Sequence, residues 1–301
     1  MYRRQFLLGL AATALVARST TLFAAATGNT GYSLPLWPGI PPGGGGPAGK
    51  IQIGLKGARS HIATPSLTVI EPAVPNGHGV LIAAGGGYKR IEMAMEAWPA
   101  AYWLVKRGYT AYILSYRLPG EGWNDGSCVA LQDAQRALRI LRSREKQVSA
   151  LGFSAGGHLL AMAATRCDYH SYPSVDALDN LPAKTDRAAL IYPIITLEKP
   201  YTHTSTHKML VGNHATDAQE AAWSAQNYVT HQTPPMFLVQ AEDDLVSSPQ
   251  NTLILQSACI REQVAVTMYR YPTGGHGFAM GRPGTPTVDW PAHYEKWLRQ
   301  T

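Results

Sequence analysis

The sequence predicts an α/β protein whose central sheet is mostly parallel and covered by helices on both faces. Seven short apolar runs show no alternation of polar and apolar residues, which is typical of strands buried on both faces. Segments with helical periodicity lie between these runs, and this order indicates a parallel sheet. The expected strands are 67–71, 79–84, 109–114, 148–152, 188–192, 236–240 and 265–271. The expected helices are 93–107, 130–143, 155–165, 249–262 and 288–299.

The helix expected at 130–143 shows the helical pattern most clearly, because its apolar residues recur on one face. That apolar face is formed by Leu131, Ala134, Leu138 and Leu141. The residues expected to face outward are Arg136, Arg139 and Arg142. The stretch 166–187 has no clear period, and we expect a long loop or a small insertion there.

Composition and charge exclude several classes of protein. The 301 residues are 45% hydrophobic and 15% charged, which is typical of a globular chain and not of a disordered or coiled-coil one. The net charge is +6, from 26 basic and 20 acidic residues, but residues 1–26 hold three arginines and no acid. Without that segment the charge is 23 − 20 = +3. No Lys/Arg-rich run occurs elsewhere, so we expect no nucleic-acid partner.

Residues 1–26 are expected to be an export signal. Arg3 and Arg4 precede a mostly apolar stretch at 7–17, which is too short for a bilayer because a spanning helix needs about 20 apolar residues. The small residues at 24–26, which follow Phe23, suit a signal peptidase. The paired arginines resemble a twin-arginine signal, which makes the twin-arginine export machinery an expected partner and the periplasm or the extracellular space the expected location. An ordinary secretory signal or an uncleaved anchor is the alternative.

The remaining chain is expected to be one domain preceded by an extended lead-in. Residues 27–50 are rich in Gly and Pro, which favours an extended segment without regular structure. Residues 51–301 contain the strand and helix pattern, with no repeat and no linker, and are expected to be a single domain. The cysteines have no metal-site or framework spacing and are expected to be buried, with one disulfide as the alternative. They are Cys128, Cys167 and Cys259.

The strongest functional signal surrounds Ser154. Residues 152–156 read Gly-Phe-Ser-Ala-Gly, between an apolar strand and a helix of small residues. This is the G-x-S-x-G nucleophile elbow in its strand–turn–helix setting. Its glycines let the strand and the helix approach each other, and the sharp turn exposes the serine hydroxyl. The backbone N–H of Ala155, at the start of the helix, is expected to face a developing oxyanion.

A run of glycines, 85–87, comes at the end of the strand expected at 79–84. Glycines at a strand end let backbone N–H groups point into a cavity. In α/β-hydrolases the loop after this strand supplies the second half of the oxyanion hole, so Gly86 or Gly87 is expected to donate there. Ala84 stands where many lipases and esterases have the His of an H-G-G-G motif. A plain glycine turn is the structural alternative.

Two later loops complete a candidate catalytic triad. Three acids at 242–244 follow the strand expected at 236–240, and the usual H-G-x-x-D pattern selects Asp244, with Asp243 as the alternative. His276 lies between two glycines after the last strand. The order Ser154, Asp244, His276 is that of the α/β-hydrolase triad.

Two other histidines lie close enough in the sequence to suggest a metal site. His203 and His207 lie four residues apart, but no Glu or Cys accompanies them in a metal-binding pattern. Pro200 and a Thr-rich run argue against a helix there, so we expect a solvated loop. We expect neither a metal nor a cofactor.

Together these motifs resemble the secreted α/β-hydrolase family of acetyl xylan esterases and related small carboxylesterases. The matching stretches are 34–39, 85–88, 115–118, 133–137, 152–159, 210–213, 233–235 and 275–277. Two departures matter. The link at 143–147 lacks the usual Asp-Pro turn, which is expected to shorten the preceding helix or shift the elbow. The turn at 245–248 lacks its usual Pro- and Val-rich sequence, which keeps Asp243 open as the acid.

The resemblance implies an α/β-hydrolase fold and a secreted serine esterase that hydrolyses short-chain, acetyl esters on plant polysaccharide such as xylan. A peptidase or lactonase with the same triad, or a non-catalytic carbohydrate-binding protein, is the alternative. Residues 193–235 show no amphipathic lid helix, and Tyr88 and Trp123 are expected near the mouth of the site. Both features favour acetyl over longer acyl groups.

Overall fold

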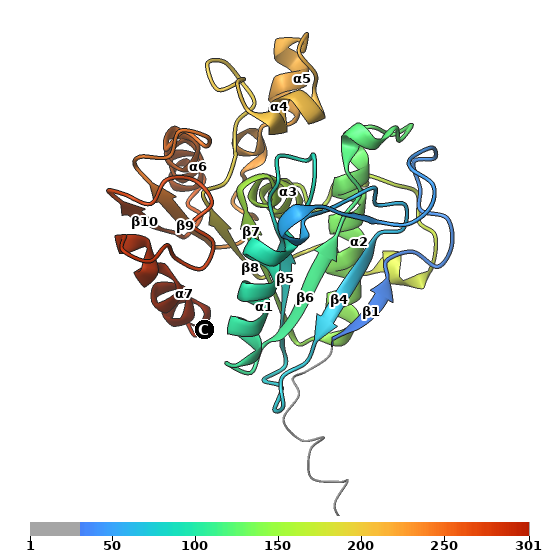
Figure 1. Cartoon of the computed structure of the whole chain (residues 1–301), viewed down its shortest axis with the longest axis horizontal. Coiled ribbons are helices and arrows are strands. Elements are labelled where there is room, and N and C mark those ends of the chain that lie inside the picture. The colour runs from blue at the N-terminus through green and yellow to red at the C-terminus, as the bar shows by residue number, and fades with distance from the viewer. Residues whose placement is uncertain (1–30, 301) are drawn as a thin grey trace, which may run out of the picture. The chain divides into compact units, whose positions relative to one another are not determined.

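An eight-stranded sheet lies between two layers of helices (Figure 1). The computed structural model describes residues 31–300, so the expected export signal at 1–26 lies outside the described residues. The strands of this sheet are β1 (Tyr32–Pro35), β4 (Ser66–Ile70), β5 (His78–Ala83), β6 (Thr110–Ser115), β7 (Gln147–Phe153), β8 (Arg187–Ile191), β9 (Met236–Ala241) and β10 (Val266–Tyr271). A second, two-stranded sheet consists of β2 (Gln52–Ile53) and β3 (Arg59–Ser60).

The main sheet is mostly parallel, as predicted. Its strand order is β1-β4-β6-β5-β7-β8-β9-β10, and every neighbouring pair from β6 to β10 is parallel. The two antiparallel pairs of this sheet are β1 with β4 and β4 with β6. All residues of β5, β6 and β9 are buried, which explains why these strands have continuous apolar runs.

Helices follow the strands and cover both faces. The helices are α1 (Trp98–Val105), α2 (Cys128–Arg144), α3 (Ser154–Thr165), α4 (Ser205–Leu210), α5 (Asp217–Ala222), α6 (Gln250–Arg261) and α7 (Trp290–Leu298). The short helical turns are η1 (Leu55–Gly57), η2 (Met93–Ala97), η3 (Pro119–Glu121), η4 (Ala177–Asn180), η5 (Ala225–Tyr228) and η6 (Pro286–Asp289). Helices α1 and α7 lie in front of the sheet in Figure 1, and α2, α3 and α6 lie behind it. Arg107, two residues after α1, forms an ion pair with Glu295 of α7.

The strand order reverses at the β5–β7 pair. The chain passes from β5 through α1 to β6 on one side, and then through α2 to β7 on the other side of β5. Ala83 of β5 is in register with Gly152 of β7, so the loops that follow these strands leave the sheet side by side. Open α/β sheets bind ligands at the carboxyl ends of strands at such a reversal. The topology therefore places the glycine loop beside the elbow of Ser154.

The lead-in expected at 27–50 contains a β-strand, so the prediction that it lacks regular structure was wrong for that part. Tyr32–Pro35 form the edge strand β1, in register with β4 from Tyr32↔Val69 to Pro35↔Ser66. Pro35 is tolerated because an edge strand has one side without a partner strand. The strand depends on pairing with distant residues, and the surrounding Gly and Pro obscured it.

Side chains from the core hold the rest of this lead-in. Trp37 Nε1 donates to Asp133 Oδ1 at 2.9 Å, and Arg136 Nε donates to the carbonyl of Leu36 at 2.9 Å. Arg117 and Asp133 form a completely buried ion pair, and Arg117 also donates to the carbonyl of Pro42. The lead-in is therefore packed against α2.

Two of the arginines expected to face outward are buried instead. Arg136 is 2% exposed and forms ion pairs with Asp176 at 2.5 Å and Asp179 at 3.0 Å. Arg139 is also buried and donates to the hydroxyl of Tyr172 at 2.7 Å. The prediction failed because the segment 166–187, which supplies these partners, folds over α2. The helix itself runs to Arg144, so the short link after it does not shorten it.

The segment around His203 and His207, expected to be a solvated loop, is partly helical. Helix α4 begins at Ser205, and the hydroxyl of Thr204 caps it by accepting from the N–H of His207 at 3.1 Å. The His207 ring is buried and contacts Glu220 Oε1 at 3.0 Å, whereas His203 is exposed.

The expected burial of the cysteines holds for Cys259 only, since Cys128 and Cys167 are partly exposed; all three are free thiols.

Candidate active site

Ser154 occupies a sharp turn between β7 and α3, with a positive φ of 49°. Close packing around this turn requires glycine on either side. A Cβ on Gly152 would lie 2.6 Å from the carbonyl oxygen of Gly156, and one on Gly156 would lie 2.1 Å from the carbonyl oxygen of Ala83. The G-x-S-x-G spacing is thus a steric requirement of this turn, which holds a serine in a strained conformation.

The structure brings Ser154, His276 and Asp244 together. Ser154 Oγ lies 2.8 Å from His276 Nε2, and His276 Nδ1 lies 2.8 Å from Asp244 Oδ2. The Asp244 side chain is completely buried, while the His276 side chain is 21% exposed. A serine, a histidine and a carboxylate in this chain of contacts form the arrangement in which the imidazole accepts the serine proton.

The turn after β9 distinguishes Asp244 from Asp243. Asp244 Oδ1 accepts hydrogen bonds from the N–H groups of Val246 at 2.8 Å and Ser247 at 2.9 Å, which leaves Oδ2 to face His276. Asp243 accepts from the N–H of Gly275 at 2.7 Å, and this hydrogen bond lowers the pKa of its exposed carboxyl. Asp243 therefore fixes the loop that carries His276 without contacting its ring.

The expected oxyanion donors are placed around Ser154 as follows. Ala155 lies in the first turn of α3, where backbone N–H groups have no partner within the helix. Gly86 and Gly87 line the same cavity as Ser154 and His276, and no acceptor within residues 31–300 takes up their N–H groups. The N–H of Gly85 is not available, because it donates to Glu96 Oε2 at 2.6 Å.

The cleft that holds Ser154 and His276 has a volume of about 420 Å³. This volume lies in the range of small-molecule binding sites. Its apolar side chains are Met95, Ile194 and Val246. Thr204, Ser205 and Thr206 at the start of α4 also line the cleft, so the segment between β8 and β9 contributes to the site through α4.

Tyr88 and Trp123 do not line this cleft, so the expectation that they narrow its mouth was wrong. Tyr88 is 1% exposed, and its hydroxyl contacts His158 Nδ1 at 3.0 Å. Trp123 packs against the lead-in, where a Cβ on Gly46 would lie 2.5 Å from its ring.

Burial lowers the pKa of His158 to about 4, and its Nε2 contacts the Trp223 carbonyl oxygen at 2.8 Å. His158 is therefore a neutral structural group.

Sequence reasoning missed two buried residues beside the triad, Glu96 and Tyr192. Glu96 lines the cleft, and its Oε1 accepts a hydrogen bond from the Tyr192 hydroxyl at 2.9 Å. The Tyr192 ring lies edge-on to the His276 ring, with 5.0 Å between centroids. The sequence held one signal for Glu96: it is an acid within the mostly apolar stretch that follows the glycine loop.

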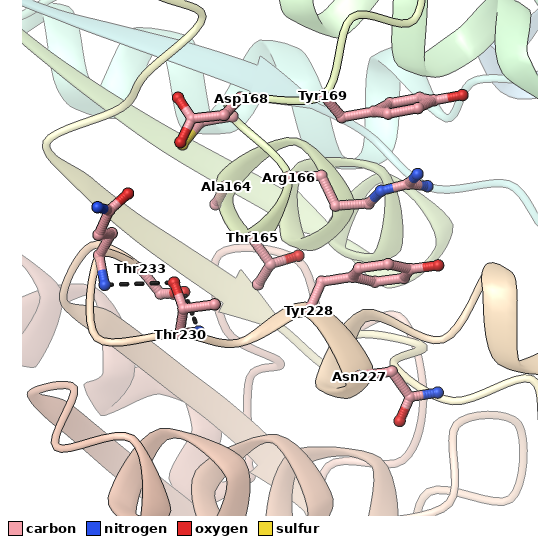
Figure 2. A pocket seen from close by; sticks show the side chains of 11 residues that line it. Ala164, Thr165, Arg166, Asp168, Tyr169, Asn227, Tyr228, Thr230 and Thr233 are labelled. Carbon is pink, nitrogen blue, oxygen red and sulfur yellow. Dashed lines mark hydrogen bonds between the residues drawn. The ribbon is translucent and has the colours of Figure 1, made fainter.

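A second cavity, also of about 420 Å³, lies at the far end of α3 (Figure 2). Figure 2 shows the Arg166 guanidinium between the rings of Tyr169 and Tyr228, at 3.9 Å and 4.3 Å from their centroids. Twelve helical steps separate Ser154 from Arg166, which corresponds to roughly 18 Å at 1.5 Å per residue. This cavity contains none of the predicted site residues.

The described part of the chain contains neither a cluster of metal ligands nor a helix that could cross a membrane. No group of three or more His, Cys, Asp or Glu within residues 31–300 is arranged to hold a metal ion. Over the same residues, no helix is both long and apolar enough to cross a membrane.

The model of one protein family, described as BD-FAE, matches residues 77–258, which is more than half of the chain. The chain belongs to the BD-FAE family. The matched range includes the glycine loop, the elbow of Ser154 and Asp244, and it ends before His276. The chain supplies that histidine from its C-terminal part, in the order typical of α/β-hydrolases.

Two curated relatives of this BD-FAE member come from bacteria. An acetylxylan esterase of Xylanibacter ruminicola is 28% identical over 221 residues, which are 70% of this chain and 43% of that protein. An endo-1,4-beta-xylanase B of Butyrivibrio fibrisolvens is 29% identical over 214 residues, which are 67% of this chain and 32% of that protein. The chain thus spans less than half the length of either relative.

Solved structures establish the fold of this BD-FAE member as that of the α/β-hydrolases. An acetyl ester-xyloside bifunctional hydrolase from Caldicellulosiruptor lactoaceticus superposes with a TM-score of 0.74 at 27% identity, covering 89% of this chain and 95% of that one. A carboxylesterase from Lactobacillus plantarum has a TM-score of 0.63 at 21% identity, covering 83% and 97%, and supports the fold alone. The predicted fold class is confirmed.

Proposed function

We propose that this protein is a serine esterase that removes short acyl groups, acetyl above all, from plant polysaccharide such as xylan. The observation that carries the proposal is the continuous chain of contacts from Ser154 Oγ through His276 to Asp244, with 2.8 Å at each step. The similar proteins, which include an acetylxylan esterase and an acetyl ester-xyloside bifunctional hydrolase, support the substrate class.

The geometry supports a two-step acyl transfer. His276 Nε2 accepts the proton of Ser154 as its oxygen attacks the ester carbonyl, and Asp244 stabilises the imidazolium that forms. The tetrahedral oxyanion accepts hydrogen bonds from Ala155 and from Gly86 or Gly87, and the loss of one such donor typically costs about 10²–10³ in kcat. His276 then protonates the leaving alcohol, and the acyl group stays on Ser154.

Water completes the cycle. His276 takes a proton from a water molecule, which attacks the acyl-enzyme, and the second tetrahedral intermediate collapses to release the carboxylic acid and the serine hydroxyl. Apart from water, the proposed reaction uses only groups that the chain supplies. A carbohydrate-binding protein without activity would not require a complete triad, and all three members are present here.

The test compares the wild-type protein with Ser154→Ala, which removes one hydroxyl and leaves the turn unchanged. We expect the wild type to release acetate from acetylated xylan and to hydrolyse p-nitrophenyl acetate, and the variant to do neither. A variant that retains more than a few per cent of wild-type kcat, at an unchanged melting temperature, would rule out Ser154 as the nucleophile. Release of amines from peptides without ester hydrolysis would favour a peptidase instead.

We also propose that the protein is exported, through the twin-arginine machinery, to the periplasm or the extracellular space. The support is the Arg3-Arg4 pair ahead of the apolar stretch at 7–17, in a segment outside the described residues. An extracellular location fits the proposed substrate, because a plant polysaccharide is too large to reach an enzyme inside the cell.

A further inference from the structure

Glu96 is a buried acid beside the triad that the proposed reaction does not use. It belongs to the π-helical turn η2, is 5% exposed and lines the same cleft as Ser154 and His276. A buried carboxylate is costly unless hydrogen bonds compensate its charge. Its partners therefore indicate what this side chain does.

The two oxygens of Glu96 join two different loops. Oε2 accepts from the N–H of Gly85 at 2.6 Å, directly before the expected oxyanion donors Gly86 and Gly87. Oε1 accepts from the hydroxyl of Tyr192 at 2.9 Å, and Tyr192 follows β8. One carboxylate thus connects the loop after β5 with the residue after β8.

Tyr192 extends this connection to the loop of His276. Its hydroxyl oxygen accepts from the N–H of Ala279 at 3.1 Å, and its ring packs edge-on against the His276 ring. Tyr192 has a positive φ of 40°, a conformation that a tyrosine keeps only where its surroundings fix it. The contacts of its hydroxyl and ring are such constraints.

We propose that Glu96 is a positioning residue of the esterase reaction, whose ionised carboxylate holds the glycine loop and the Tyr192–His276 contact in their working geometry. This inference rests on the proposed function. The observed hydrogen bonds favour the ionised form, because both oxygens of Glu96 act as acceptors, from the N–H of Gly85 and from the hydroxyl of Tyr192. Protonation would make one of these oxygens a donor and weaken the hydrogen bond that it accepts.

The surroundings of Glu96 put its ionisation near neutral pH. Burial raises the pKa of Glu96 to about 7, and the charge of Glu92 adds to this rise. The hydrogen bonds from Gly85 and Tyr192 and the charge of His276 act in the opposite direction. The charge of Glu96 in turn raises the pKa of Tyr116, which is buried nearby. The working form is therefore present above pH 7 and is lost as the pH falls through about 7.

The deciding experiment measures kcat and kcat/KM for p-nitrophenyl acetate against pH for the wild type and Glu96→Gln. An amide keeps the size of the side chain but has one acceptor where the site needs two. We expect kcat to fall by about 10², the loss typical of a small misplacement, with KM changed far less. The acid limb of kcat/KM, which reports every group that must lose a proton, should lose one ionisation in the variant.

The control is Glu262→Gln, the same change at a partly exposed residue directly after α6, which should leave kcat and the profile unaltered. If Glu96→Gln does not fold, Tyr192→Phe tests the same link, and a loss in kcat at an unchanged melting temperature supports the proposal. An acid limb and a kcat equal to those of the wild type in the folded Glu96→Gln, or an unchanged kcat in Tyr192→Phe, would overturn it. A wild type no more active than Ser154→Ala would instead refute the proposed function.

Discussion

Gln240 Nε2 lies 3.2 Å from Asp244 Oδ2, the same oxygen that faces His276 Nδ1. Gln240 is the last but one residue of β9, and its amide also donates to the carbonyl oxygens of Ala241 and Ser247. The carboxylate is therefore held from the strand and from the turn at once. This arrangement fixes the orientation of Asp244 before any substrate binds.

The first prediction follows from this arrangement. Asp244→Asn should reduce kcat far more than Asp243→Asn, because only the side chain that faces His276 sets the tautomer of its ring. A loss of about 10⁴ has precedent for the corresponding change in another triad enzyme. Steady-state kinetics on p-nitrophenyl acetate measures both variants. If Asp243→Asn proves the more damaging, the carboxylate has been assigned to the wrong residue.

The second prediction concerns the length of the acyl group. The cleft offers few apolar side chains, chiefly Met95, Ile194 and Val246, and each extra methylene gains about 0.8 kcal/mol only where it becomes buried. Acetyl esters should therefore have a kcat/KM about tenfold or more above that of octanoyl esters. Both p-nitrophenyl esters are measured on one preparation, below the concentration at which the longer ester aggregates. A preference for octanoyl would contradict the acetylesterase proposal.

The buried ion pair of Arg117 and Asp133 gives a prediction for stability. Asp133→Asn leaves the Arg117 charge buried without its partner, and breaking such a pair typically lowers the free energy of unfolding by about 3–5 kcal/mol. The matched control is Asp217→Asn, which removes an exposed partner of Lys199 and should leave the unfolding midpoint unchanged. Urea titrations of both variants decide the matter, and equal midpoints would show that the buried pair contributes nothing.

The last prediction tests export. Replacing Arg3 and Arg4 together by lysine should retain the protein in the cytoplasm, because the twin-arginine route requires the pair while a general secretory signal needs only positive charge. Arg18→Lys is the control, since it makes the same change in the same segment and keeps the pair. Fractionation of the cells reports the location, and export of the double variant at the control level would favour the general route.

The parts of the site that could be predicted from sequence are those fixed by local geometry. The elbow around Ser154 needs glycines at set positions because the carbonyl oxygens of Ala83 and Gly156 leave no room for a Cβ. The glycines on either side of His276 mark a loop for another reason, since Gly275 and Gly277 both have a positive φ, 61° and 70°. The choice of Asp244 depended on a spacing pattern, and the turn that orients this carboxylate could not be derived from it.

The parts that could not be predicted depend on contacts between distant segments. Glu96 and Tyr192 are 96 residues apart, and nothing near either residue indicates that they meet. Arg136 carries the charge of a surface residue, and it is buried only because Asp176 and Asp179 are brought over it. The strand β1 likewise exists through its register with β4. In each case the contacting residue lies too far along the chain for a local sequence pattern to reveal it.

The contacts between the core and residues 36–42 limit where this domain can be cut when it is fused to another protein. Asp133 accepts from the Trp37 indole, and Arg117 donates to the Pro42 carbonyl, so both members of the buried pair use the lead-in. The relatives from Xylanibacter and Butyrivibrio show that matching regions occur within longer polypeptides. A gene fusion that joined this domain to another protein at residue 51 would separate the buried pair from Trp37 and Pro42. A fusion that keeps these contacts and the pairing of β1 with β4 has to include β1 (Tyr32–Pro35).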